Sequence, residues 1–165
     1  MTLSLTLTQA LWFLPIAVPI CFYIAWTDMK FMKIPNKAVL LLLAGFAITG
    51  FFALPLEDYL WRYAHIGAVL ALGFIVASAG LVGAGDAKFA TAMAPFVAFP
   101  DLSLVLTLFA AMLIGAFVAH RLAGRIPAIR SATADWASWG EKRDFPMGLA
   151  LGGTLACYLA LPLLT

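Results

Sequence analysis

Residues 38–54, with the sequence AVLLLLAGFAITGFFAL, contain no charged side chain. A helix needs about 20 mostly apolar residues to cross a bilayer, so this run predicts a membrane-spanning helix. The whole chain has the same character, because 64% of its 165 residues are hydrophobic, only 11% are charged, and the mean hydropathy is +1.02. A soluble domain has about 45–50% apolar and about 25% charged residues, and a chain this short cannot bury such an excess in one aqueous core. The protein is therefore predicted to be embedded in lipid.

Polar residues divide the chain into six apolar segments, which predict about six transmembrane helices. These segments cover residues 8–26, 38–54, 63–82, 86–100, 102–119 and 145–164. The first segment has no Lys or Arg before it, unlike a cleavable signal peptide, so it is expected to remain as a span. The expected fold class is an all-α, polytopic membrane helix bundle, with residues 1–165 forming one integral-membrane domain.

The basic residues predict the orientation of these segments. If the N-terminus lies outside, the inside loops cover residues 28–37, 83–88 and 120–144. These loops hold nine of the ten basic residues, namely Lys30, Lys33, Lys37, Lys88, Arg121, Arg125, Arg130, Lys142 and Arg143. Only Arg62 falls outside, so the positive-inside rule predicts that both termini are extracytoplasmic. The net charge of +2 is too small to suggest nucleic-acid binding.

Asp28 and Asp86 lie at the same predicted boundary. Asp28 ends the first segment and Asp86 begins the fourth, so the two segments between them return the chain to the side that it left. Both carboxylates are thus expected at the cytoplasmic boundary, where packing of the bundle can bring them together.

The fourth segment is unusually short. Residues 89–100 make about 18 Å of helix, against a hydrocarbon layer of about 30 Å. Either this helix stops short, or the turn at residues 83–86 dips into the membrane. Irregular backbone at that depth needs protein to cover it or water to reach it, which would put Asp86 in a wet cavity.

Two motifs surround the aspartates. GAGDAK, residues 83–88, has two glycines before Asp86, so another backbone can approach closely and an extended substrate could pair with it. DMKFMKIPN, residues 28–36, has Asp28 at the end of one segment and a Pro35–Asn36 turn before the next. Ionisable side chains at membrane depth are costly and are candidates for function by default. Taken singly, Asp86 could equally cap a helix, and Asp28 could belong to an ordinary loop.

Together, the motifs resemble those of the type IV prepilin peptidase family, the GxGD-type intramembrane aspartyl proteases. The resemblance consists of an aspartate after the first span, IPN at residues 34–36, GxGDxK opening the fourth span, and a compatible six-span layout. It covers essentially the whole chain. FPMG, residues 145–148, also resembles a Pro-aromatic-Gly element near the family's last span, with methionine in place of the aromatic residue.

The resemblance implies a membrane-embedded aspartyl endopeptidase whose catalytic pair is Asp28 and Asp86. The matching positions that are expected to bind substrate or shape the site are Gly83, Gly85, Lys88, Pro35 and Asn36. The implied substrate is a pilin-like precursor with a short basic leader followed by a hydrophobic helix. Cleavage at the cytoplasmic face of the bacterial inner membrane would remove that leader.

One departure from the larger bacterial members narrows this interpretation. Those members carry a cytoplasmic insert with paired CxxC motifs, and they also N-methylate the cleaved pilin. This chain has neither the insert nor such cysteines. It resembles the short members that serve Flp/Tad-type pili, and archaeal preflagellin peptidases, so methyltransferase activity is not expected.

The chemistry suits a pair of aspartates. Two nearby carboxylates cannot easily both ionise, so one retains a proton. The ionised member can take a proton from the attacking water, and the protonated member can donate to the scissile carbonyl oxygen. This reaction needs no metal, cofactor or covalent intermediate. Cys21 and Cys157 lie in apolar runs without a CxxC pair, so no metal site is expected.

Several other side chains have two interpretations. Lys88 could bias ionisation of the aspartate pair or lie at the lipid headgroups. His65 and His120 have no partner at triad spacing and are interpreted as interfacial. Four residues of the last inside loop recur at helical spacing and predict either an interfacial amphipathic helix or an irregular loop with incidental tryptophans: Ile129, Ala132, Trp136 and Trp139.

The main competing function is that of a transporter or proton relay, since such proteins also use intramembrane acids. It has less support, because the two halves of the sequence show no inverted repeat and the acids gather at one face. A membrane assembly factor without catalytic activity is a third possibility.

Overall fold

The structure, a computed structural model, describes residues 3–141 and 145–164. All regular structure in these residues is helical, which confirms the all-α prediction. The helices are α1 (Leu7–Phe31), α2 (Asn36–Ala53), α3 (Leu56–Ser78), α4 (Ala84–Met93), α5 (Leu102–Ala123), α6 (Pro127–Ala132) and α7 (Met147–Ala160). Short 3₁₀ helices are η1 (Ala94–Phe96), η2 (Phe99–Asp101), η3 (Ala137–Trp139) and η4 (Leu161–Leu163).

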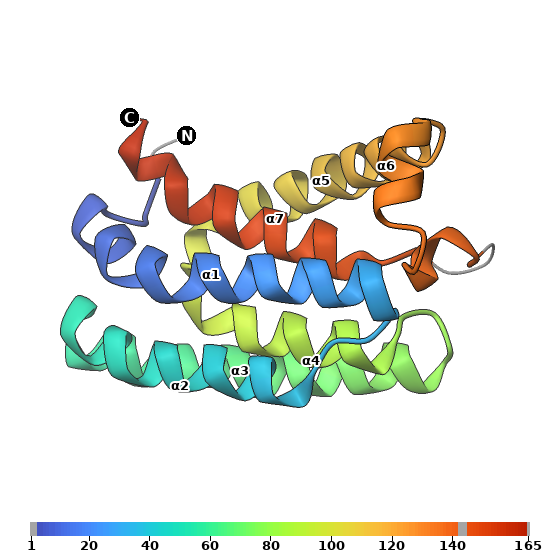
Figure 1. The fold of residues 1–165 in the computed structure, drawn as a ribbon. Coiled ribbons are helices and arrows are strands. Elements are labelled where there is room, and N and C mark those ends of the chain that lie inside the picture. Colours follow the sequence, from blue (N-terminus) through green and yellow to red (C-terminus); the bar gives the residue numbers. More distant parts are fainter. Residues whose placement is uncertain (1–2, 142–144, 165) are drawn as a thin grey trace.

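The described residues form a helical membrane bundle. Four segments are long and apolar enough to cross a membrane, and these are Leu7–Phe31, Asn36–Ala53, Leu56–Ser78 and Phe99–Ala123. The segment Met147–Leu163 is apolar but shorter, and α4 has only 10 residues. Helices α1 to α5 and α7 run alternately along one axis, and the two ends of the chain lie at the same end of the bundle (Figure 1). Six crossings and extracytoplasmic termini remain predictions.

The N-terminal helix is defined by local sequence signals at both of its ends. Thr6 and Gln9 form a capping box at its start, with Thr6 N–H donating to Gln9 Oε1 at 3.0 Å and Gln9 N–H donating to Thr6 Oγ1 at 3.3 Å. The chain leaves α1 at Met32, whose φ of 52° is left-handed. This conformation costs a residue with a side chain about 1–2 kcal/mol, and here it turns the chain toward α2.

Helix α3 differs from the predicted span at both ends. It begins at Leu56 rather than at residue 63, because Pro55 precedes it and acidic Glu57 and Asp58 occupy its first turn, where they complement the helix dipole. It ends at Ser78 rather than at residue 82, since Gly80 turns the chain with a φ of 71°.

The fourth segment is short, as predicted. Helix α4 ends at Met93, and the remainder of the segment forms η1 and η2, each of which contains a proline. Proline lacks the N–H that would continue an α-helix, so Pro95 and Pro100 explain why the segment breaks into 3₁₀ turns.

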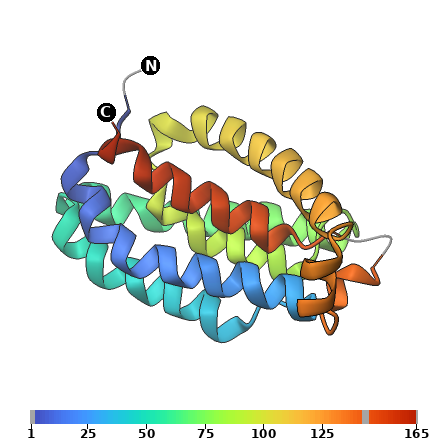
Figure 2. The ribbon, with the colours of Figure 1, turned by 45° about the horizontal axis from the view of Figure 1, so that its top comes forward.

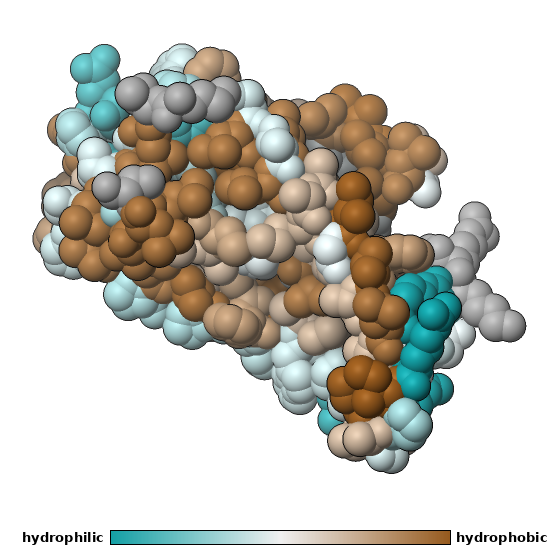
Figure 3. Space-filling view, turned by 90° about the horizontal axis from the view of Figure 1, so that it is seen from above, coloured by the Kyte–Doolittle hydropathy of each residue, from teal (hydrophilic) through white to brown (hydrophobic). Residues whose placement is uncertain are grey.

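The hydrophobic core lies where α1, α2, α4 and α7 meet. Phe13, Phe46 and Phe96 are fully buried there, with ring centroids 5.2–6.1 Å apart. Helices α3 and α5 are peripheral and contribute few buried residues. Hydrophobic residues cover much of the face shown in Figure 3, and hydrophilic residues gather toward its ends. This surface suits contact with lipid along the bundle and with water at its ends.

A buried carboxylate connects several segments by hydrogen bonds at the end of the bundle where the termini lie. Asp101, the last residue of η2, is only 4% exposed. It accepts hydrogen bonds from the backbone N–H groups of Ser4 at 2.9 Å and Leu5 at 3.1 Å, and from the Tyr158 hydroxyl at 2.8 Å. Asp101 therefore joins the N-terminal segment to α7.

The described part of the loop that was predicted to lie inside, residues 120–141, does not form one amphipathic helix. Helix α6 ends at Ala132, and the Trp139 indole N–H donates to the carbonyl oxygen of Thr133 at 2.9 Å. Trp139 also stacks on His120 with ring centroids 4.4 Å apart, and His120 is only 9% exposed. The loop thus folds over His120, and the interfacial depth of this histidine stays a prediction. Lys142 and Arg143, which were counted among the basic residues of this loop, lie outside the described ranges.

Candidate active site

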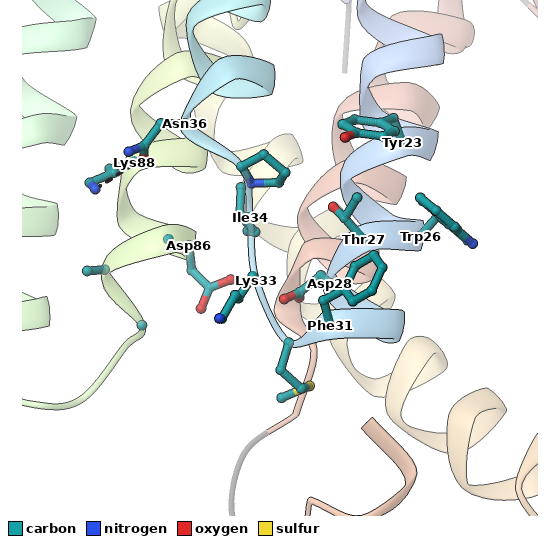
Figure 4. A pocket seen from close by; sticks show the side chains of 15 residues that line it. Tyr23, Trp26, Thr27, Asp28, Phe31, Lys33, Ile34, Asn36, Asp86 and Lys88 are labelled. Carbon is teal, nitrogen blue, oxygen red and sulfur yellow. Dashed lines mark hydrogen bonds between the residues drawn. The ribbon is translucent and has the colours of Figure 1, made fainter. Parts of the chain in front are cut away.

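Asp28 and Asp86 line the same recess. Asp28 lies near the C-terminal end of α1 and is 6% exposed, whereas Asp86 lies in the first turn of α4 and is half-buried. The recess has a volume of about 670 Å³ and opens to the surface beside the α1–α2 loop. In Figure 4 the two carboxylates point toward one another across it, and their charges interact. The fold thus brings together the two aspartates that the sequence singled out.

Asp28 is held by the beginning of α7. The backbone N–H of Gly148 donates to Asp28 Oδ2 at 2.7 Å, and Gly148 is the second residue of α7. A helix N-terminus favours a negative charge, so this contact suits a carboxylate. Any side chain at Gly148 would collide with the aspartate, because a Cβ there would lie 2.9 Å from both Cβ and Oδ2 of Asp28. The FPMG stretch therefore positions Asp28.

Asp86 packs closely against Gly83, the N-cap of α4. A Cβ at Gly83 would lie 2.6 Å from Asp86 Oδ2, so a side chain at this position would displace the carboxylate.

The IPN and GxGDxK motifs pack against each other. Ile34 lies against Gly85, where an added Cβ would be 3.4 Å from Ile34 Cβ. Pro35 precedes the first residue of α2, and the Lys88 amino group donates to Asn36 Oδ1 at 3.3 Å. Figure 4 shows Lys88 directed toward Asn36 rather than toward Asp86. The loop between α1 and α2 is thereby held against the start of α4, and it forms one wall of the recess.

Other residues around the recess were not predicted to belong to it. Lys33 lines the recess, although the sequence analysis counted it only among the basic residues that predict the topology. Tyr23, Trp26 and Phe31 of α1 line its other side, where apolar residues at a membrane boundary carry no distinguishing pattern. Gly148 was missed as a contact of Asp28, and the only signal for it was the FPMG resemblance.

The charged loop that follows α5 also reaches α1 beside the site. Lys30, two residues after Asp28, forms an ion pair with Asp135 at 2.9 Å. Within residues 3–141 and 145–164, no group of three or more His, Cys, Asp or Glu side chains is arranged to hold a metal ion. The recess therefore contains two facing carboxylates, one of which accepts a hydrogen bond from a glycine amide, and it is open to the surface.

Comparisons with known proteins point to one family. The model of the type IV leader peptidase family matches residues 15–120, a range that includes both aspartates and both motifs. The family suggested by the motifs is thereby confirmed. No curated protein and no solved structure matches the chain.

Proposed function

Since the chain belongs to the type IV leader peptidase family, we propose that it is an aspartyl endopeptidase that removes the short basic leader from Flp-like type IV pilin precursors. It would act as a multi-pass protein of the bacterial inner membrane and cut at the cytoplasmic face. The observation that carries this proposal is the pair of facing carboxylates in one recess.

In the proposed reaction, Asp28 and Asp86 share one proton. The ionised carboxylate takes a proton from water as the water oxygen attacks the scissile carbonyl carbon, and the protonated carboxyl group gives its proton to the carbonyl oxygen. The resulting diol collapses, the C–N bond breaks, and the amine leaves with a proton from one carboxyl group. One diol hydroxyl returns its proton to the other carboxylate as the new acid forms, so the pair ends with one proton again.

The other predicted site residues have supporting roles in this proposal. Gly83 and Gly85 keep the start of α4 free of side chains, so that the backbone of an extended substrate can approach Asp86. Pro35 and Asn36 fix the loop that forms the facing wall, and Lys88 holds Asn36. None of these residues donates or accepts a proton in the reaction.

The direct test is mass spectrometry of a pilin precursor incubated with membranes that contain this protein. The expected result is one new cut between the basic leader and the apolar helix, and no cut in membranes that lack the protein. An intact precursor in the presence of correctly inserted protein would contradict the proposal.

The same preparation distinguishes a proton relay from a peptidase. A relay would give pH-dependent ion flux across liposomes that contain the purified protein, without any processing of the precursor. A peptidase would process the precursor whether or not a pH gradient is present.

A further inference from the structure

An apolar groove runs along the bundle between α3 and α5. It has a volume of about 430 Å³, and α4, η1 and α7 form its floor. Helix α3 packs on α4, and α5 packs on α7, so the space between α3 and α5 stays open to the side. Figure 2 shows α5 set apart from α3, with α4 and α7 between them.

The groove ends at the candidate active site. Asp86 lines the groove at the end where α4 and α7 begin, together with Val82 and Met147. The same three residues line a second opening, which also contains Asp28 and Gly83. The groove is therefore continuous with the carboxylate pair, on the side away from the α1–α2 loop.

The groove can contact about three turns of a helix and has a largely apolar surface. Along α3 its lining extends from Val76 to His65, which is about 16 Å at the helical rise per residue. Apart from Asp86, only His65 and Thr154 bring polar side chains to the lining. Its small residues include Ala68, Ala90 and Ala94. Small residues let two helix backbones approach closely within a membrane.

We propose that this groove receives the apolar helix of the precursor, an inference that rests on the proposed peptidase function. The helix lies between α3 and α5 with its N-terminal end at Asp86, so the peptide bond before it reaches the carboxylates. The basic leader then continues into the recess beside Asp28 and the α1–α2 loop. This arrangement separates the two parts of the substrate, with an apolar groove for the helix and a polar recess for the leader.

A lipid acyl chain is the competing occupant. It matches the apolar lining, but it gives no reason for the groove to end at a carboxylate pair or for small residues on its floor. A helix explains both features, because its backbone needs close approach and its N-terminal end must reach the site of cleavage.

Photocrosslinking from two leucines of α3 tests the proposed occupant. Leu72 lines the groove and is 61% exposed, whereas Leu70 is 52% exposed and lies outside the groove. p-Benzoylphenylalanine is placed at each position in turn, together with Asp86→Asn so that the uncut precursor persists. Each variant is first assayed with Asp86 intact, which tests cleavage separately from docking.

The expected result is an adduct with the apolar helix of the precursor that is several-fold stronger from position 72 than from position 70. Equal adducts from both positions, or adducts with lipid alone, would contradict the docking proposal if the proteins still cleave the precursor. The proposed peptidase function would then still stand. If the unsubstituted protein does not cleave the precursor, the proposed function fails and the docking proposal fails with it.

A steric block gives an independent measurement. Ala68→Trp fills the groove, whereas Ala71→Trp places the same side chain at an exposed position of α3 outside it. Ala68→Trp is expected to slow cleavage of the full precursor about tenfold, because the misplaced helix moves the scissile bond away from the carboxylates. It leaves cleavage of a peptide without the apolar helix unchanged. Equal cleavage of the full precursor by both variants would overturn the proposal.

Discussion

Each aspartate of the proposed pair lies against a glycine at a position that has no room for a side chain. Gly148 N–H donates to Asp28, Gly83 lies beside Asp86, and an added Cβ at either glycine would collide with the neighbouring carboxylate. Each glycine also lies at the start of a helix, where the dipole stabilises a negative charge by about 0.3–1 kcal/mol. The two glycines are therefore positioning residues, since they fix where the carboxylates point without taking part in the reaction.

Gly148→Ala is expected to reduce cleavage strongly. The new Cβ would lie 2.9 Å from Asp28 Oδ2, so the carboxylate has to move. A misplacement of about 1 Å in a catalytic group can cost about 100-fold in rate. The measurement is the rate of precursor cleavage per amount of inserted protein.

Gly153→Ala is the matched control for that substitution, because it places the same methyl group on the same helix. The nearest atom to its Cβ would be Met112 Sδ at 3.4 Å, an ordinary contact. Cleavage by this variant should stay close to that of the unsubstituted protein. Equal losses from both variants would mean that α7, rather than Asp28, is disturbed.

The residues of the candidate site could be predicted only in part. Asp28 and Asp86 stand out because acids are rare in this chain and both lie beside recognisable motifs. The contact between Gly148 and Asp28 joins residues 120 positions apart, and no local pattern reports such a contact. The recess also includes Lys33, whose charge already had a sufficient explanation in the topology.

At the scale of the elements, the α1–α2 loop and the start of α4 form one unit. The left-handed Met32 turns the chain out of α1, Ile34 packs on Gly85, and Asn36 accepts a hydrogen bond from Lys88. The spacing of the IPN motif after Asp28 is therefore the length of chain that brings the loop against α4. This unit forms the wall of the recess that faces the basic leader in our proposal.

A double-mutant cycle tests this connection. Asn36→Ala and Lys88→Ala are each expected to slow cleavage about two- to threefold, because the exposed hydrogen bond that they break is worth about 0.5 kcal/mol. The double variant should be no slower than either single variant, since all three lack the same contact. Lys37→Ala, at the exposed lysine that follows Asn36, is the control and should cleave at the normal rate. Fully additive losses in the double variant would show that Asn36 and Lys88 act separately.

The sequence predicted which segments are helices better than it predicted where they end. The short fourth segment followed from counting apolar residues before Pro100, whereas α3 begins before its apolar run because Pro55 and two acids start a helix there. The helical spacing from Ile129 to Trp139 was misleading in part. Trp139 packs back onto His120 and donates a hydrogen bond to Thr133, and these tertiary contacts outweigh the local pattern.

At the scale of the whole molecule, the helices that form the core differ from those at the edge of the bundle. Helices α1, α2, α4 and α7 supply the core and both carboxylates, while α3 and α5 stand at the edge and flank the groove. At the end opposite the candidate site, Asp101 binds Ser4, Leu5 and Tyr158 and so closes the bundle. The core helices thus surround the carboxylates, and the groove is open at the edge of the bundle.

Tyr158→Phe tests that closure. The Tyr158 hydroxyl donates to Asp101 and accepts from Ala98 N–H, so its loss removes the acceptor of the Ala98 N–H and one of the hydrogen bonds to Asp101. The free energy of unfolding should fall by about 1–3 kcal/mol, as measured by denaturation in mixed detergent micelles. Tyr23→Phe, at a half-exposed tyrosine, should change it little, and equal effects would contradict the role of Asp101.

Labelling with a membrane-impermeant maleimide tests the predicted topology. Leu164→Cys and Glu57→Cys should react in intact cells, whereas Lys37→Cys should react only after the membrane is permeabilised, as the positive-inside rule predicts. The unsubstituted protein, which contains Cys21 and Cys157, gives the background. Labelling of Lys37→Cys in intact cells would reverse the orientation and place the recess on the outer face.

The central claim is that Asp28 and Asp86 together cleave the precursor, and it is tested most directly by the fraction of precursor cleaved by Asp28→Asn and Asp86→Asn. Each substitution keeps the shape of the side chain but removes an ionisable group from the pair. We expect each variant to insert and accumulate normally and to leave the precursor uncut, while Glu57→Gln, at an exposed acid far from the recess, cleaves it fully. Full cleavage by either aspartate variant would contradict the account.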